Sequence, residues 1–352
     1  MKNPEQMSKS VYYQIADQFE VSAIYHHNGR LIFRARPYRD PEQAVATVRK
    51  RLDSAGFEGR FKEDVHGMLI SVKELPLARR IPRLNIILFF ATLLTMFFAP
   101  VLLSLDFSYF RLPGAAAERL EFTVALMAIL LFHEFGHYLA GRRRGVLMSL
   151  PYFIPAPNIV GTFGAIIKSR SPFANRRDLI EVGAAGPLAG FIISVIALSL
   201  GLQQTEVILT ESGAGLTLGD SLLIRLLTWL FVGPIPEGYD YVLSPAAFAG
   251  WVGLLITMIN LLPLGQLDGG HIVYGLIGRH QHRLSRLFFA AMIVLGFWWP
   301  GWWLFGVLVF LFGMRHPPTI NDARVPSLAA RLMGIAALII FVISFVPVPF
   351  KM

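Results

Sequence analysis

The sequence predicts a polytopic α-helical membrane protein with a small α+β domain at its N-terminus. Hydrophobic residues make up 54% of the 352 residues and charged residues only 16%, whereas soluble domains are about a quarter charged. Apolar runs near the roughly 20 residues that cross a bilayer follow one another after residue 84. We therefore divide the chain into a soluble domain, residues 1–83, and a membrane domain, residues 84–352, with about six to eight transmembrane segments.

The charge of the chain points to a lipid bilayer and not to nucleic acid. The formal net charge is +9, but the basic residues form short clusters beside apolar runs, which is typical of the cytoplasmic flanks of membrane spans. The absence of cysteine excludes disulfides, thiolate zinc sites and cysteine nucleophiles. The first 20 residues contain no apolar core and no small-residue cleavage site, so we expect no secretory signal.

The soluble domain contains a predicted hairpin, a helix and a further strand. Asn28-Gly29 separates two alternating apolar runs, which is a strong hairpin signal. Asp40 is a candidate N-cap, followed by Pro41 at the first turn of a helix that Gly56 ends. We expect about four strands and one helix, with a core so small that the domain leans on the membrane or on a regulatory partner.

The membrane domain contains five apolar runs that are long enough to span. Residues 287–314 contain Pro300-Gly301 and are flanked by basic residues (Arg283 and Arg286 before, Arg315 after), which favours two short spans over one kinked helix. Prolines and glycines punctuate the strand-like runs of 146–169, which favours a re-entrant hairpin over an ordinary cytoplasmic loop. Residues 222–233 are too short to span and predict an interfacial helix. The predicted spans are 84–105, 120–139, 179–202, 246–264 and 328–346.

Charge predicts the orientation of these spans. Every short loop rich in arginine or lysine falls on one side, and the loops of the other side carry mainly Asp and Glu. By the positive-inside rule the N-terminal domain is cytoplasmic. We expect a multi-pass protein of the cell (cytoplasmic) membrane, with a plastid membrane as the alternative.

Small and aromatic residues in the spans predict packing and anchoring. Gly183, Gly186 and Gly190 have the small-xxx-small spacing of closely packed membrane helices. The tryptophans around Pro300-Gly301 predict interface anchors; they are Trp298, Trp299, Trp302 and Trp303.

The stretch "LLFHEFGHYL" (130–139) places ionisable groups inside a predicted span. His133 and His137 are one helical turn apart and project from one face, and Glu134 is rotated by about 100° from His133. This is the His-Glu-x-x-His arrangement of two zinc ligands and a general base. Because ionisable groups are costly at this depth, a buried metal is a better explanation than an unpartnered cluster.

A hydrolytic zinc site needs a third protein ligand, and few residues at span depth can supply it. The span 246–264 runs inward, and "NLLPLGQLDGGH" follows its helical part. Pro263 and Gly265 break the helix, and Gly269-Gly270 leave the backbone free to turn. Asp268 is the candidate third ligand, and His271 is the alternative.

The HEFGH motif together with Asn260-x-x-Pro-x-x-x-Leu-Asp-Gly269 resembles the site-2 protease family of intramembrane zinc metalloproteases. The resemblance covers roughly residues 84–350 and includes "GTFGA", "GPLAG" and the closing "FVPVPF". It implies one zinc ion held by His133, His137 and Asp268, with Glu134 as base. It also implies that Asn260 contacts the substrate or transition state. No PDZ-like insertion is visible, which is similar to the cyanobacterial and plastid branch.

The resemblance implies an endopeptidase that cleaves the transmembrane segments of other proteins. The alternatives are an inactive scaffold of the same family, which the intact motif disfavours, and a transporter. Broken helices suit a transporter, but no internal symmetry is evident among the spans. A di-iron membrane oxidase would need more clustered histidines than the nine in the chain. The sequence leaves open whether the chain forms a homo-oligomer.

Overall fold

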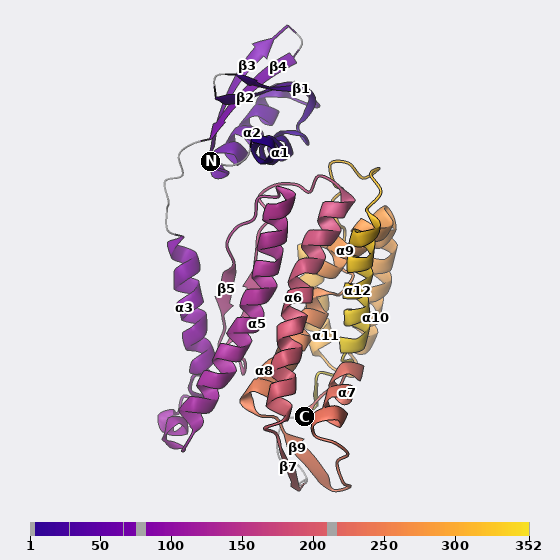
Figure 1. Ribbon diagram of the computed structural model, residues 1–352. Coiled ribbons are helices and arrows are strands. Elements are labelled where there is room, and N and C mark those ends of the chain that lie inside the picture. Colours follow the sequence, from indigo (N-terminus) through magenta and orange to yellow (C-terminus); the bar gives the residue numbers. More distant parts are fainter. Residues whose placement is uncertain (1–3, 28, 66, 75–81, 210–216, 352) are drawn as a thin grey trace.

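The chain folds into an N-terminal α+β region and a larger, mostly helical body (Figure 1). The computed structural model describes residues 4–27, 29–65, 67–74, 82–209 and 217–351. Asn28 of the predicted hairpin and the predicted basic flank at Arg79 and Arg80 lie outside the described residues.

The N-terminal region is a four-stranded antiparallel sheet with two helices, where we predicted one. The strand order is β1-β2-β4-β3. The predicted hairpin is confirmed, with His27 paired to Arg30, and so is the N-cap, since Asp40 accepts the backbone N–H of Glu42 at 3.0 Å. The elements are α1 (Pro4–Ile15), β1 (Phe19–His27), β2 (Arg30–Pro37), α2 (Pro41–Ser54), β3 (Phe57–Asp64) and β4 (Gly67–Glu74).

This region is an internal repeat that we did not predict. Both halves run helix–strand–strand, and both helices begin with Pro-Glu-Gln. β2 and β4 pair antiparallel at the centre of the sheet, where Phe33 lies opposite its counterpart Ile70. Val11 and Ile15 of α1 and Val48 and Leu52 of α2 close one common core. The repeat was missed because the identities are few and scattered: beyond the helix starts they include Val11 with Val48 and Phe19-Glu20 with Phe57-Glu58, while most buried positions share only their apolar character.

Helices build the rest of the molecule around α6, which contacts α5, α8, α9 and α12. Small two-stranded sheets, β7–β9 and β8–β10, lie at the end of the body away from the N-terminal region (Figure 1). The elements are α3 (Arg83–Phe97), α4 (Ala99–Ser104), η1 (Phe107–Arg111), α5 (Ala115–Arg144), β5 (Tyr152–Pro155), β6 (Thr162–Ile166), α6 (Arg176–Leu202), β7 (Glu206–Leu209), β8 (Thr217–Leu218), α7 (Leu222–Phe231), β9 (Tyr239–Val242), α8 (Pro245–Asn260), α9 (Asp268–Ile277), η2 (Gly278–His280), α10 (Gln281–Leu295), α11 (Gly301–Phe312), α12 (Leu328–Ser344) and β10 (Phe350–Lys351).

Four of the five long apolar runs form single helices, and one is broken. The run 84–105 divides into α3 and α4 at Phe98, because Pro100 lacks the N–H that would continue the helix and restricts the residue before it. Among the described helices, α6 alone is both long and apolar enough to cross a membrane by itself. Shorter apolar helices are α3, α7, α8, α11 and α12.

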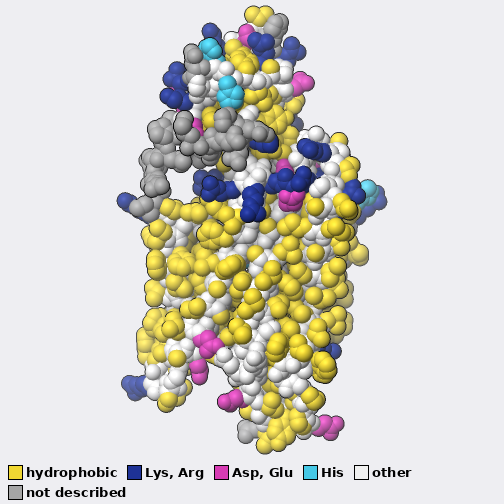
Figure 2. Space-filling view, in the orientation of Figure 1, with side chains coloured by type: hydrophobic (Ala, Val, Ile, Leu, Met, Phe, Trp, Pro, Cys, Tyr) yellow, Lys and Arg dark blue, Asp and Glu magenta, His cyan; other side chains and the backbone are white. Residues whose placement is uncertain are grey.

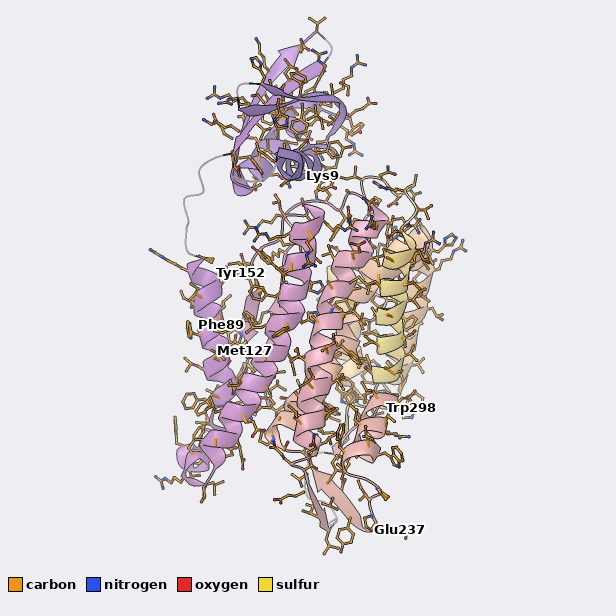
Figure 3. The ribbon with its side chains drawn as sticks, viewed as in Figure 1. Lys9, Phe89, Met127, Tyr152, Glu237 and Trp298 are labelled. Atoms are coloured by element: carbon orange, nitrogen blue, oxygen red, sulfur yellow. The ribbon has the colours of Figure 1, made fainter. Side chains whose placement is uncertain are left out.

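Residues 287–314 contain the end of α10 and all of α11, which are two separate helices as favoured, and the connection between them, residues 296–300, ends at Pro300. The expectation that all four tryptophans anchor at an interface is wrong for Trp302. Its side chain is 1% exposed, and its Nε1–H donates to the carbonyl of Pro347 at 2.7 Å. Trp298 remains 67% exposed (Figure 3).

The predicted hairpin within 146–169 forms as β5 and β6, which pair antiparallel. β5 packs against α3, and β6 contacts α5; Figure 3 shows Tyr152 of β5 above Phe89 of α3 and Met127 of α5. Gly161 packs its backbone against α3, since a Cβ there would overlap the main chain of Met96. The hydroxyl of Thr95 donates to the Gly161 carbonyl at 2.7 Å. The hairpin is therefore fixed to α3.

Candidate metal centre

The His-Glu-x-x-His sequence lies in the second half of α5, where His133 and His137 point into the body. Their side chains are 3% and 5% exposed. Both residues stand on the face of α5 that packs on α6, one helical turn apart, so their Nε2 atoms come within 3.3 Å of each other. Two imidazole nitrogens at this separation can both ligate one metal ion.

Asp268 completes the cluster from α9. Its Oδ2 lies 3.3 Å from Nε2 of His133 and 3.2 Å from Nε2 of His137. Zinc holds nitrogen and oxygen ligands at about 2.0–2.2 Å in a tetrahedron, which sets neighbouring ligand atoms about 3.3 Å apart. The three atoms therefore already have the spacing of three corners of a zinc tetrahedron. Within the described part of the chain they form the one group of three such side chains close enough to hold a metal.

The orientation of His137 suits ligation through Nε2. Its Nδ1 lies 2.8 Å from the backbone carbonyl of Val182, which can only accept a hydrogen bond. The proton is therefore assigned to Nδ1, and the lone pair of Nε2 is directed at the other two ligand atoms.

Glycines of α6 make this close approach of the two histidines possible. A Cβ at Gly186 would overlap the ring of His137, and one at Gly190 would come within 2.9 Å of Nδ1 of His133. Gly183 faces the other side of the site, since its Cβ would lie 2.9 Å from Cβ of His271. The predicted close packing of the three glycines is confirmed, and the surface they contact is the metal centre itself.

Glu134 lies beside the three ligand atoms and is not one of them. Its side chain is 5% exposed, and its Oε2 has no hydrogen-bond partner among the described residues. A buried carboxylate oxygen without a partner is costly, so it marks a place where a further polar group belongs.

Asn260 is the last residue of α8 and borders the cluster from another direction. Its side-chain nitrogen lies 3.3 Å from Nε2 of His133.

α8 ends here as predicted, before Pro263 and Gly265. Gly269 and Gly270 have ordinary helical backbone angles in α9, so they serve close packing and not conformational freedom. A Cβ on either would overlap the carbonyls of residues 261–265.

The sequence profile of "Peptidase family M50" matches residues 121–298, which is half of the chain and includes all the residues of the cluster. The chain belongs to this family, the site-2 proteases. Members of this family bind zinc, and His133, His137 and Asp268 form its site in this chain. Their donor atoms and the spacing between these atoms fit a zinc ion.

Named relatives of this M50 chain are plant proteins. It is 33% identical over 238 residues to "Probable zinc metalloprotease EGY2, chloroplastic" of Oryza sativa subsp. indica, covering 63% of this chain and 42% of the relative. The Arabidopsis thaliana EGY2 protein is 32% identical over 256 residues (68% and 42%). Arabidopsis EGY1 is 35% identical over 251 residues (65% and 43%). The chain thus spans about two fifths of the length of these relatives. No solved structure matches.

The structure does not bring His271, the alternative ligand, to the metal centre of this M50 chain. Its Nδ1 lies 2.6 Å from Nε2 of His316, and its ring contacts Phe173 at 5.6 Å between ring centroids. His316 was not singled out from the sequence, because it stands in a polar loop far along the chain. His282 also contacts this loop, since its Nε2 lies 3.2 Å from the carbonyl of His316.

Ion pairs join the two helices that carry the site at the end nearest the N-terminal region. Arg144 of α5 lies 3.6 Å from Asp178 of α6 and also pairs with Glu181. Arg177 pairs with Glu181 at 2.7 Å. Asp178 is 3% exposed, so this cluster is part of the packing between α5 and α6 and not a set of solvent-exposed ion pairs.

Proposed function

We propose that this chain is a zinc-dependent intramembrane endopeptidase that hydrolyses peptide bonds within or near transmembrane segments of membrane proteins. The observation that carries the proposal is the convergence of His133, His137 and Asp268 at 3.2–3.3 Å, with the unpartnered carboxylate of Glu134 beside them. When bound there, zinc supplies the Lewis acidity that lowers the pKa of a water and polarises the scissile carbonyl.

In this proposal the chain supplies the proton transfer and the positioning. Glu134 accepts the proton of the attacking water and passes it to the leaving amine, since its free Oε2 faces the site. Asn260 donates its amide N–H toward the oxygen on which negative charge develops. The apolar helices around the site keep bulk water away from both groups.

The β5–β6 hairpin is the proposed docking place for an unwound substrate segment. A transmembrane helix hides its peptide bonds, so it must become extended before hydrolysis. β6 belongs to a two-stranded sheet, and Phe163 on it is 72% exposed. An extended segment can add to such an edge through main-chain hydrogen bonds. The attachment of the hairpin to α3 also fits a hairpin that re-enters the membrane beside that helix.

The membrane arrangement is likewise a proposal. We infer crossings by α3, α5, α6, α8, α10, α11 and α12, which fall within the predicted six to eight. The basic side chains gather where the N-terminal region adjoins the body, and acidic ones gather toward the opposite end (Figure 2). This charge distribution supports a cytoplasmic N-terminal domain of residues 1–83, with its own core, and a membrane domain of residues 84–352. The organism that expresses the chain decides whether this membrane is a cell membrane or a plastid membrane.

The test is cleavage of single-span membrane proteins by the detergent-purified full chain. We expect fragments from the wild type, none after zinc is removed with a chelator, and recovery when zinc is restored. Glu134→Gln should bind zinc and cleave at least ~100-fold more slowly, because the base is lost and the ligands are kept. Glu118→Gln, at an exposed glutamate of the same helix, is the matched control and should cleave normally. Equal cleavage by Glu134→Gln and wild type would overturn the proposal.

A further inference from the structure

The ligand Asp268 is the first residue of α9, a helix of only ten residues. Helices of this length are marginal by themselves and depend on contacts with their surroundings. No side chain caps the N-terminus of α9. The position of the Asp268 carboxylate therefore depends on whatever holds the rest of this helix.

The C-terminal end of α9 is held by α6. The guanidinium of Arg176 donates to the carbonyls of Gly275 at 2.9 Å and Leu276 at 2.7 Å. These are two of the carbonyls that a helix end leaves without partners, and a cation there also complements the helix dipole.

The side of α9 is held by residues 313–327, the connection between α11 and α12, which we name the strap. The hydroxyl of Tyr274 donates to Oδ2 of Asp322 at 2.6 Å. The other oxygen of Asp322 accepts from the backbone N–H and the hydroxyl of Thr319, at 3.0 and 2.6 Å. Both oxygens are thus committed, and the carboxylate joins α9 to a turn within the strap.

A pair of histidines makes the second junction between α9 and the strap. Nδ1 of His316 lies 2.5 Å from the Pro317 carbonyl and carries the proton, so Nε2 accepts the N–H of His271 at 2.6 Å. Burial lowers the pKa of His316 to about 4, so its ring is neutral at pH 7 as this pattern requires.

The strap is itself tied to the segment before α6. The backbone N–H groups of Ile320 and Asn321 donate to the carbonyls of Phe173 and Ala174, at 3.0 and 2.8 Å. The strap therefore has fixed points on both of its neighbours and does not depend on α9 for its own place.

We propose that the strap is a positioning device for the metal site, with Tyr274 and Asp322 as positioning residues that hold α9 and thereby the carboxylate of Asp268 at the two histidines. The inference rests on the proposed function in taking Asp268 as the third ligand. A ligand 0.5 Å out of place is enough to weaken a site of this kind, and Tyr274 lies nearly two helical turns from Asp268 along α9.

The test measures zinc affinity by chelator competition in the full-length protein, for Tyr274→Phe, Asp322→Ala and the double variant. We expect about 10-fold weaker zinc binding in each single variant, in the range of other residues that orient ligands. The double variant should match Asp322→Ala, because both changes remove one shared bond. Tyr239→Phe, at a tyrosine 42% exposed on β9, is the control and should bind zinc as the wild type does.

A second readout separates positioning from general destabilisation. In the zinc-free protein, backbone hydrogen exchange should quicken in α9 of both single variants while the unfolding temperature stays unchanged. Unchanged zinc affinity in Tyr274→Phe and Asp322→Ala would overturn the inference and leave the proposed function standing. A wild type that binds no zinc would overturn the proposed function, and unchanged α9 exchange would then overturn the strap as well.

Discussion

At the scale of single residues, the site depends on close packing between two imidazole rings and the glycines that face them. His133 and His137 reach one ion position because α6 presents bare backbone to them at Gly186 and Gly190. Glu134 is buried beside these histidines, and its Oε2 has no hydrogen-bond partner among the described groups. The motif on α5 is therefore necessary for the site and not sufficient, because the facing helix must offer room.

Gly186→Ala should abolish zinc binding without changing any ligand. A Cβ at this position overlaps the imidazole ring of His137, and that ring is held by its hydrogen bond to the Val182 carbonyl, so it would have to leave its ligating position. Zinc content of the purified variant, measured by atomic emission, should fall well below that of the wild type. The matched control is Gly306→Ala in α11, where a Cβ meets nothing closer than 3.7 Å. Normal zinc content in Gly186→Ala would contradict the packing argument.

At the scale of elements, short segments position the residues of the site, and long helices form the body around it. The sequence predicted the helices of the motif, the end of α8 before Pro263 and the β5–β6 hairpin, because apolar periodicity, proline and glycine act locally. It did not predict the break at Phe98 or the strap. The strap depends on contacts between distant segments, such as Tyr274 with Asp322, which no local pattern reveals. The break at Phe98 has a local cause in Pro100, which our prediction did not take into account.

Phe163→Ser should raise KM for a membrane substrate several-fold and leave kcat and zinc content near their wild-type values. Phe163 is 72% exposed on β6, so its replacement removes contact area for a substrate strand and little packing of the fold. The comparison is Phe107→Ser, at a phenylalanine 71% exposed in η1 at the other end of the body. If both variants had the same kinetics as the wild type, β6 would not be the docking edge.

At the scale of the whole molecule, a repeated α+β unit adjoins a helical body whose metal centre lies between α5, α6, α8 and α9. α1 contacts the turn that ends α5, since a Cβ at Gly145 would lie 3.4 Å from the ring of Tyr13. That turn is preceded by the helix that carries His133 and His137. Composition predicted an N-terminal α+β region before a mostly helical body, whereas the repeat was hidden, because its two halves preserve burial at many positions and residue identity at only a few.

The absence of cysteine from the sequence offers a direct test of orientation. A cysteine placed at Lys62 of β3 should react with a membrane-impermeant maleimide only after the membrane is opened. One placed at Glu237, at the far end of the body (Figure 3), should react in intact cells or vesicles of native orientation. The charge distribution predicts this pattern through the positive-inside rule. The opposite labelling pattern would invert the proposed topology.

The central claim is that His133, His137 and Asp268 together hold one zinc ion. The most direct measurement is the zinc content of the detergent-purified protein, compared with His133→Ala and Asp268→Ala. We predict about one zinc per chain in the wild type and a large loss in both variants, since three protein ligands are the set that a hydrolytic zinc site uses. A wild type that remains free of zinc after metal-replete purification, or an Asp268→Ala variant that keeps its zinc, would contradict it.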